Sequence, residues 1–478
     1  MTCASEHIYF LDSLNLFVET QWLYNTPVTH LLSEGLLDLF PNEWSTALQR
    51  LENEELNDFV VRKTTKPEWS EGLRTFVEKC KCIDRLPIID IVLPATVPKN
   101  FRTGLSSKKQ HEIMYLAHLV NAECASRNIK VIVDLGAGLG YVCQLLYHLY
   151  GYKVLGLEKN QANVNTARNR QTKFYPDSLG HVKYSCCDLT CDSVETIETI
   201  LNDEFGENTD VCLIGLHACG DLSICASKIF RDMKAARALI VVPCCYHKLS
   251  ISKSTKVNAS TEKQYFNNFP LSSCLKDVIS NSGLDVGSFL RQPFLRLACQ
   301  EPADRWYNMS TETHDQHSFY VLARAVLQLY ATKNGFSLKK CTQKGTRKSQ
   351  CLDFETYIKD SLHRYTLKKL EEGKLLYKYT NNCITETKNI QSRCVLDAQF
   401  NFETHEQNMI DLWESHSDKL KLAEIYTGLQ MMLQAPAESL VLQDRLCWMK
   451  EQGLRAKIVP VMHRRLSPRA YAIVSQKR

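Results

Sequence analysis

The 478-residue sequence has no long apolar run, and no Lys or Arg precedes Arg50. No stretch approaches the roughly 20 apolar residues that cross a bilayer, so we expect no membrane partner. The first 30 residues also lack the basic start and apolar core of a secretory signal peptide. The residues before Arg50 include several acids and no arginine. A mitochondrial transit peptide is rich in arginine and poor in acids, so we do not expect one here.

The 20 cysteines follow no regular spacing and include no Cys-x-x-Cys pair. Thiols outside the secretory route usually stay reduced, so we expect a cytoplasmic or nuclear protein with free thiols. A composition of 44% hydrophobic and 23% charged residues is ordinary for a soluble globular protein. At roughly 150 residues per domain, the length predicts several folding units.

From about residue 108, short apolar runs alternate with amphipathic stretches. The runs are residues 131–135, 154–157, 182–185, 211–216 and 238–242. The stretches between them are residues 141–150, 161–174, 194–205 and 222–233. This alternation predicts an α/β fold, in which a parallel sheet is covered by helices on both faces. Ligands bind at the carboxyl ends of the strands in such sheets.

The rest of the chain predicts additions to this core, which we place at residues 105–250. Residues 1–104 read as an N-terminal helical cap. Residues 251–440 read as an insertion, helical at 408–433 and partly basic and flexible. Residues 441–478 contain two β-like runs, 457–462 and 471–475, which we expect to return to the sheet as a hairpin.

A glycine-rich loop follows the first predicted strand, with Asp134 at the end of that strand and Gly136, Gly138 and Gly140 at alternate positions. Glycines let a ligand approach the backbone, and the next helix offers free N–H groups to a carboxylate. The dinucleotide fingerprint is G-x-G-x-x-G, but position 141 is Tyr. The spacing therefore favours S-adenosylmethionine over a dinucleotide.

Acidic residues end the next two predicted strands. Glu158 lies 20 residues after Gly138, where a carboxylate accepts from both hydroxyls of a ribose. Asp188 closes the third strand, where it would accept from the amine of adenine while Leu189 packs on the ring. Each acid alone also fits a helix start. The loop and both acids together predict a cofactor site, braced by Asp134.

The ends of the fourth and fifth strands predict the acceptor side of the site. Methyl transfer requires an aligned nucleophile and, where needed, a base that removes its proton. Candidate bases and positioning residues are His217, Asp221 and His247, and Tyr246 is a candidate for stacking on a planar acceptor. Cys244 and Cys245 belong to the same motif.

No metal site is predicted. Zinc on Cys219, Cys244, Cys245 and His247 is the alternative, but it needs four well-placed ligands, and no Cys-x-x-Cys pair supports it. Cysteines at strand ends more often act as small buried hydrophobic side chains.

Charged residues lie on either side of this core. Lys108, Lys109 and Glu112 open a helix before the first strand, where they face the cofactor or, as we favour, form a solvated face. Residues 331–380 contain 12 Lys or Arg against 5 Asp or Glu, with tyrosines between them. Basic residues among aromatics suit RNA, although such a run is more often a solvated or disordered insertion.

Several motifs together resemble one family. They are Ser-Lys-Lys-x-His-Glu at 107–112, Leu-His-Ala-Cys-Gly-Asp-Leu at 216–222, Cys-Cys-Tyr-His at 244–247, and the C-terminal residues 456–460 and 466–469. The chain resembles the methyltransferase-like protein 25 group, also described as ribosomal RNA adenine dimethylase domain-containing proteins. This resemblance implies a Rossmann-like class I methyltransferase with a seven-stranded sheet that uses S-adenosylmethionine.

A more distant resemblance bears on the acceptor. Enzymes that methylate an adenine amine usually end strand four with Asn or Asp, prolines and an aromatic, whereas residues 216–221 read Leu-His-Ala-Cys-Gly-Asp. The His-x-Cys-Gly and Cys-Cys-x-His motifs are similar to those of tRNA acceptor-stem 2′-O-methyltransferases. The resemblance therefore implies an RNA partner, rRNA or tRNA, and an oxygen acceptor. A protein or small-molecule acceptor, or a non-catalytic cofactor-binding scaffold, is the alternative.

Overall fold

The computed structural model describes residues 3–87, 98, 101–102, 104–206, 209–252, 263–301, 303–340, 353–362, 364–369, 375–379, 393–395, 402–463, 467 and 470–477. The chain forms two compact units. One consists of Met1–Glu19, Phe76–Tyr307 and Met431–Arg478, and the other of Thr20–Thr75 and Asn308–Gln430. Residues from the predicted cap and from the predicted insertion therefore occur in both units.

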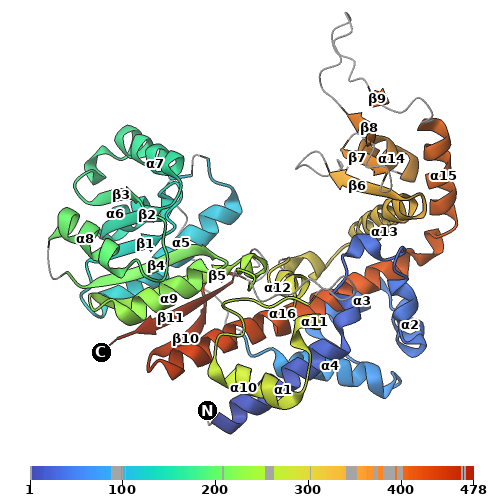
Figure 1. Ribbon diagram of the computed structural model, residues 1–478, viewed down its shortest axis with the longest axis horizontal. Helices are drawn as coiled ribbons and strands as arrows, with labels where there is room; N and C mark the ends of the chain where they lie inside the picture. The colour runs from blue at the N-terminus through green and yellow to red at the C-terminus, as the bar shows by residue number, and fades with distance from the viewer. Residues whose placement is uncertain are drawn as a thin grey trace, which may run out of the picture. The chain divides into compact units, whose positions relative to one another are not determined.

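A seven-stranded sheet forms the centre of the first unit, in the order β10-β11-β5-β4-β1-β2-β3 (Figure 1). The strands are β1 (Val131–Leu135), β2 (Lys153–Glu158), β3 (Val182–Cys186), β4 (Val211–Cys219), β5 (Ala236–Cys244), β10 (Arg455–Pro460) and β11 (Tyr471–Gln476). The first five strands are parallel. The last strand, β11, is antiparallel to β5 and lies between it and β10. Read from the other edge, the order is β3-β2-β1-β4-β5-β11-β10. A dinucleotide-binding sheet has the order 3-2-1-4-5-6, so it differs beyond the fifth strand, where this sheet has the antiparallel β11 between β5 and β10.

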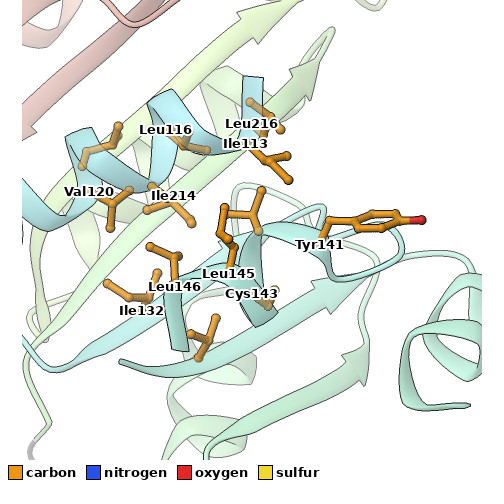
Figure 2. Close-up of a cluster of buried hydrophobic side chains, with 14 of the residues drawn as sticks. Ile113, Leu116, Val120, Ile132, Tyr141, Cys143, Leu145, Leu146, Ile214 and Leu216 are labelled. Carbon is orange, nitrogen blue, oxygen red and sulfur yellow. The ribbon is translucent and has the colours of Figure 1, made fainter. Parts of the chain in front are cut away.

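Helices α5 (Ser107–Ala125), α6 (Tyr141–Tyr150) and α7 (Gln161–Phe174) share one hydrophobic core with alternate residues of the strands. Figure 2 shows how Ile113 and Leu116 of α5 and Leu145 of α6 meet Ile132 and Ile214 of the sheet. All five side chains are fully buried. Helix α9 (Leu222–Asp232) packs on β4 and β5 without joining this core. The sheet is thus covered on both faces, which explains why its strands are almost continuously apolar.

The predicted fold class is confirmed. Strand β1 and helices α6, α7 and α8 (Val194–Phe205) have the predicted bounds, and the other core strands extend the predicted runs by a few residues. The C-terminal hairpin joins the sheet as expected. The remaining helices of this unit are α1 (Cys3–Glu19), α10 (Ser273–Ser282), α11 (Val286–Phe289) and α12 (Gln292–Leu297). Among the described helices, none is both long and apolar enough to cross a bilayer.

The second unit differs from the sequence-based expectation. It contains α2 (Asn42–Gln49), α3 (Asn53–Arg62), α13 (Thr311–Lys333), α14 (Phe354–Leu362) and α15 (Phe402–Glu414). It also contains an antiparallel sheet of β6 (Phe336–Lys340), β7 (Tyr365–Lys369), β8 (Leu375–Tyr379) and β9 (Arg393–Val395). These strands were not predicted, because their alternation of apolar residues with lysines also reads as a charge run.

Two long helices include residues of both units, namely α4 (Glu71–Ile83) and α16 (Leu420–Glu451). The helix predicted at 408–433 is wrong in its bounds. The structure divides this stretch between α15 and α16, and Pro436 lies inside α16 instead of beyond its end. Residues 415–419 contain no apolar side chain, and the structure places the break between the two helices in this polar stretch.

Tyr184 of β3 fixes the packing around the loop after β1. Its hydroxyl donates to the carbonyl of Gly140 at 3.3 Å and accepts from the amide of Gln144 at 3.1 Å. A Cβ on Gly140 or on Gly156 would lie 2.2 Å or 2.8 Å, respectively, from a Tyr184 atom. Glycine at both positions is therefore what lets this ring lie under the loop.

Gly156→Ala is expected to destabilise the fold by about 1–3 kcal/mol, because the added methyl overfills a packed core. The matched control is Gly180→Ala, whose Cβ meets nothing within 4 Å and whose free energy of unfolding should change by less than about 0.5 kcal/mol. Urea unfolding measures both. Equal stability of the two variants would contradict the packing described.

Candidate active site

The loop after β1 is held in place by its own backbone. The amides of Gly136 and Ala137 both donate to the carbonyl of Leu157 at 2.9 Å, which ties the loop to β2. Gly136, Gly138 and Gly140 have φ values of 87°, 58° and 74°, a region that favours glycine. A Cβ on Gly138 would meet nothing within 4 Å, so the loop presents its backbone to open space at that point.

Glu158, at the end of β2, holds this loop from the side. Its Oε2 accepts from the amide of Gly138 at 3.0 Å, and its Oε1 accepts from the amide of Asn160 at 2.9 Å. Oε1 also accepts from Nδ2 of Asn163 at 3.4 Å. A carboxylate has about four lone-pair positions, so these three bonds leave one position for a ribose hydroxyl. The structure therefore brings together the loop and the acid that the sequence predicts as the core of the cofactor site.

Asp134 links β1 to the helix beyond the loop. The side chain is buried, and its Oδ2 accepts from the thiol of Cys143 in α6 at 3.3 Å. The pKa of Asp134 is raised to about 6, mainly by burial; the Cys143 hydrogen bond opposes this rise and the nearby charge of Glu158 adds to it. This position fits the predicted bracing role and lies beneath the site surface.

The predicted adenine acid lies at the rim. Asp188 follows β3, and its side chain is 62% exposed with Oδ2 2.7 Å from Nζ of Lys159. Leu189 beside it is half-buried. An exposed ion pair contributes about 0–1 kcal/mol, so Lys159 would compete only weakly with an adenine amine for the Asp188 carboxylate.

His217 near the end of β4 meets a buried acid that the sequence analysis placed on a solvated face. Its Nε2 lies 3.5 Å from Oε2 of Glu112 in α5, and the other oxygen of Glu112 accepts from Ser467 at 2.8 Å. Burial alone would raise the pKa of Glu112, but the contacts with His217, Ser467 and Lys108 together lower it. The sequence holds a sign of this burial, since Glu112 shares a helix face with Leu116 at the i,i+4 spacing.

The second ring nitrogen of His217 is the one that can accept a proton. Its Nδ1 is buried and has no hydrogen-bond partner among the described residues. Because Nε2 faces a carboxylate, the neutral ring carries its proton on Nε2 and its lone pair on Nδ1. His217 is therefore oriented as a proton acceptor.

Asp221 is engaged in structure on both of its oxygens. Oδ2 accepts from the amide of Ser250 at 2.9 Å, and Oδ1 accepts from the side chain of Asn268 at 2.8 Å. The neighbouring Gly220 has φ 54°, and a Cβ there would lie 2.7 Å from the carbonyl of Lys248. Asp221 thus fastens the loops after β4 and β5 together, and this contact network does not fit a catalytic base.

The residues of the Cys-Cys-Tyr-His motif, 244–247, contact two different parts of the structure. Tyr246 is 1% exposed and donates to Glu438 of α16 at 3.1 Å, so it does not present a stacking surface. Nδ1 of His247 lies 3.6 Å from the thiol of Cys299, next to α12. Cys244 and Cys245 instead lie near Cys219, with their sulfur atoms within 4.8 Å of one another.

The second unit contains a cavity of about 430 Å³ between α13 and α16. It is lined by Asn53, His314, Asp315, Gln316, Ser318, Phe319, Leu420, Lys421 and Glu424. None of the residues predicted for the cofactor or acceptor site lines it.

The described residues fit S-adenosylmethionine. The open side of Gly138 leaves room for the ligand, and the first turn of α6 offers N–H groups to its carboxylate. Glu158 is placed for the ribose, and the β4 end with His217 lies on the acceptor side. The residue roles stay predictions.

Comparisons with known proteins agree with this geometry. Residues 108–252 match the model of a methyltransferase domain family. The probable methyltransferase-like protein 25 of Mus musculus is 27% identical over 288 residues, which cover 59% of this chain and 40% of the mouse protein. The human protein of that name is 26% identical over 607 aligned positions, which cover 94% of this chain and 93% of the human protein.

Among solved structures, M. capricolum TrmK in complex with S-adenosylhomocysteine is 20% identical and covers 29% of this chain and 51% of its own. The TM-score of this comparison is 0.21.

Fold and site together define a methyltransferase domain of the Rossmann-like class, for which S-adenosylmethionine is the methyl donor. The predicted relationship to the methyltransferase-like protein 25 family is confirmed.

Gly138→Arg is expected to abolish binding of S-adenosylhomocysteine, because the new side chain enters the open space in front of the loop. Gly151→Arg is the matched control, since Gly151 also has a positive φ and open surroundings but lies at the far end of α6. Isothermal titration calorimetry measures both. Binding by the Gly138 variant at wild-type affinity would place the cofactor elsewhere.

Proposed function

We propose that this chain transfers a methyl group from S-adenosylmethionine to RNA, in the cytoplasm or nucleus. The observation that carries the enzymatic part is the pairing of a half-buried His217 with the buried Glu112 beside the cofactor loop. A protein that only bound the cofactor would not need an oriented proton acceptor at this strand end.

Bound S-adenosylmethionine supplies the methyl group. The chain's own residues bind and orient the reactants: Glu158 accepts from a ribose hydroxyl, and the first turn of α6 receives the carboxylate. His217 takes the proton of the acceptor on Nδ1, while Glu112 stabilises the imidazolium that forms. A hydroxyl acceptor requires such a base, so this pair favours an oxygen atom over an amine.

The RNA part of the proposal draws on the sheet of the second unit. In the β6–β7 pair, Ser337 lies opposite Lys368, and Lys339 lies opposite Thr366, so both lysines project from the same face. Both lysines are exposed, whereas Leu367, on the opposite face, is 1% exposed. A sheet with a buried apolar face and a basic outer face suits the phosphate backbone of RNA. Residues 341–352, 363, 370–374 and 380, also part of the predicted basic segment, lie outside the described residues.

His217→Ala is expected to lower methyl transfer to RNA from cells lacking the protein by about 10²–10⁴-fold, the usual contribution of a general base. Affinity for S-adenosylhomocysteine should stay within a few fold. His148→Ala, an exposed histidine on α6, is the control and should keep full activity. Full activity of the His217 variant would exclude this residue as the base. Transfer of label to protein and not to RNA would favour a protein acceptor.

Reversing the charges on the second sheet tests the RNA surface. Lys339→Glu with Lys368→Glu should weaken RNA binding and lower the slope of log K against log salt by about 2, roughly one per lost phosphate contact. The control pair is Lys130→Glu with Lys234→Glu. These two exposed lysines precede β1 and β5 of the seven-stranded sheet, so they lie at the amino ends of the strands, away from the candidate site at the carboxyl ends. Filter binding over a salt series measures the slope. An equal loss in both pairs would mean that only net charge matters.

A further inference from the structure

Three thiols converge at the carboxyl ends of two neighbouring strands. Cys219 ends β4 and Cys244 ends β5, and the two residues are partners in the parallel register with their sulfur atoms 3.0 Å apart. Cys245 follows directly. All three sulfur atoms lie within 4.8 Å of one another, on residues that are buried or half-buried.

The backbone of Cys245 is what makes the third thiol part of this cluster. Successive side chains on a strand point to opposite faces, so Cys244 and Cys245 would ordinarily diverge. Cys245 instead has φ 50°, a left-handed conformation that costs a non-glycine residue about 1–2 kcal/mol. Strain of this kind persists where the surroundings impose it, and it often marks a functional site.

The surroundings that impose it are the contacts between the two loops. The carbonyl of Lys248 leaves no room for a Cβ on Gly220, and the amide of Gly220 donates to the carbonyl of Cys244 at 3.1 Å. The carboxylate of Asp221 holds the amide of Ser250. The thiols are thus placed by a rigid frame.

The electrostatics favour the thiolate. Lys248 lies beside the cluster, where its backbone carbonyl and Cβ pack against Gly220, and a nearby lysine favours the thiolate form of a cysteine. The thiolate is the form that binds metals.

We infer that Cys219, Cys244 and Cys245 bind one Zn²⁺ ion as thiolate ligands at the acceptor side of the methyltransferase domain. Zinc prefers tetrahedral thiolate sites, and the cluster offers three ligands within the part of the chain that the structure describes. The fourth position is then open to water or to an acceptor atom, as in zinc sites that take part in reactions. Binding releases to solvent the protons of those thiols that are still protonated, and Lys248 offsets the resulting negative charge.

Two other thiol groups lack these properties. Glu6, Cys274 and Cys447 also lie close together, but Glu6 pairs with Lys450 at 2.8 Å and burial raises the pKa of Cys447. Cys191 and Cys225 have sulfur atoms 2.9 Å apart, but burial raises the pKa of Cys225 to about 12. The second pair makes a matched control.

The test begins with the full-length protein purified without chelators. Plasma mass spectrometry should find about one zinc ion per chain, and Co²⁺ exchanged into the protein should give sulfur-to-cobalt charge-transfer absorption. Neither measurement depends on methyl transfer, so a negative result here leaves the proposed enzymatic function standing.

Two variants locate the site. Cys219→Ser should lower zinc affinity by more than about 100-fold, since loss of even an outer-shell partner costs 10–100-fold. Cys245→Gly removes a ligand and relieves the positive φ together, so it should fold at least as well as wild type and carry no zinc. Cys191→Ser should keep its zinc. Circular dichroism and S-adenosylhomocysteine binding verify folding.

Several outcomes would overturn the inference: zinc-free protein with no cobalt absorption, a Cys219–Cys244 disulfide found by alkylation and mass spectrometry of freshly purified protein, or equal zinc in Cys245→Gly and wild type.

Discussion

The hydrogen bond from the Gly138 amide to Glu158 is the interaction on which the cofactor site depends. It joins the loop after β1 to the end of β2, 20 residues further along the chain. The parallel register makes it possible, because Asp134 pairs with Gly156 and the two strands end at the same edge. The backbone amides of Gly136 and Ala137, which both donate to the carbonyl of Leu157, hold the same loop against β2. With the loop held in this way, Glu158 keeps a lone pair for a ribose hydroxyl and Gly138 keeps its open side.

The same edge of the sheet supplies the acceptor side. Strands β4 and β5 end next to each other, and Asp221 and Gly220 press their loops together. At these strand ends His217 faces Glu112 of α5, and the three cysteines lie together. One rigid edge therefore holds His217 and the thiol cluster, and the side chains of Asp221 and Tyr246 are hydrogen-bonded within its frame.

Much of the core could be predicted from the sequence, since the strands of a buried parallel sheet are short apolar runs and their helices are amphipathic. The glycine spacing and Glu158 also predicted that the loop and this acid lie together, and the strand order places them at one edge. The sequence did not predict the pairing of Glu112 with His217, or the burial of Tyr246, because both depend on helices that pack from distant parts of the chain. The convergence of Cys245 with Cys219 depends on one unusual φ angle, which no spacing rule reveals. The strands of the second sheet were missed because lysines alternate with apolar residues in them.

A crystal structure of the full chain with bound S-adenosylhomocysteine is the most direct test of the central claim. The account predicts a ribose hydroxyl within hydrogen-bond distance of Glu158, the Gly138 amide still donating to that carboxylate, and the cofactor carboxylate at the first turn of α6. A nucleoside bound away from Glu158, or a loop that leaves it on binding, would contradict the account.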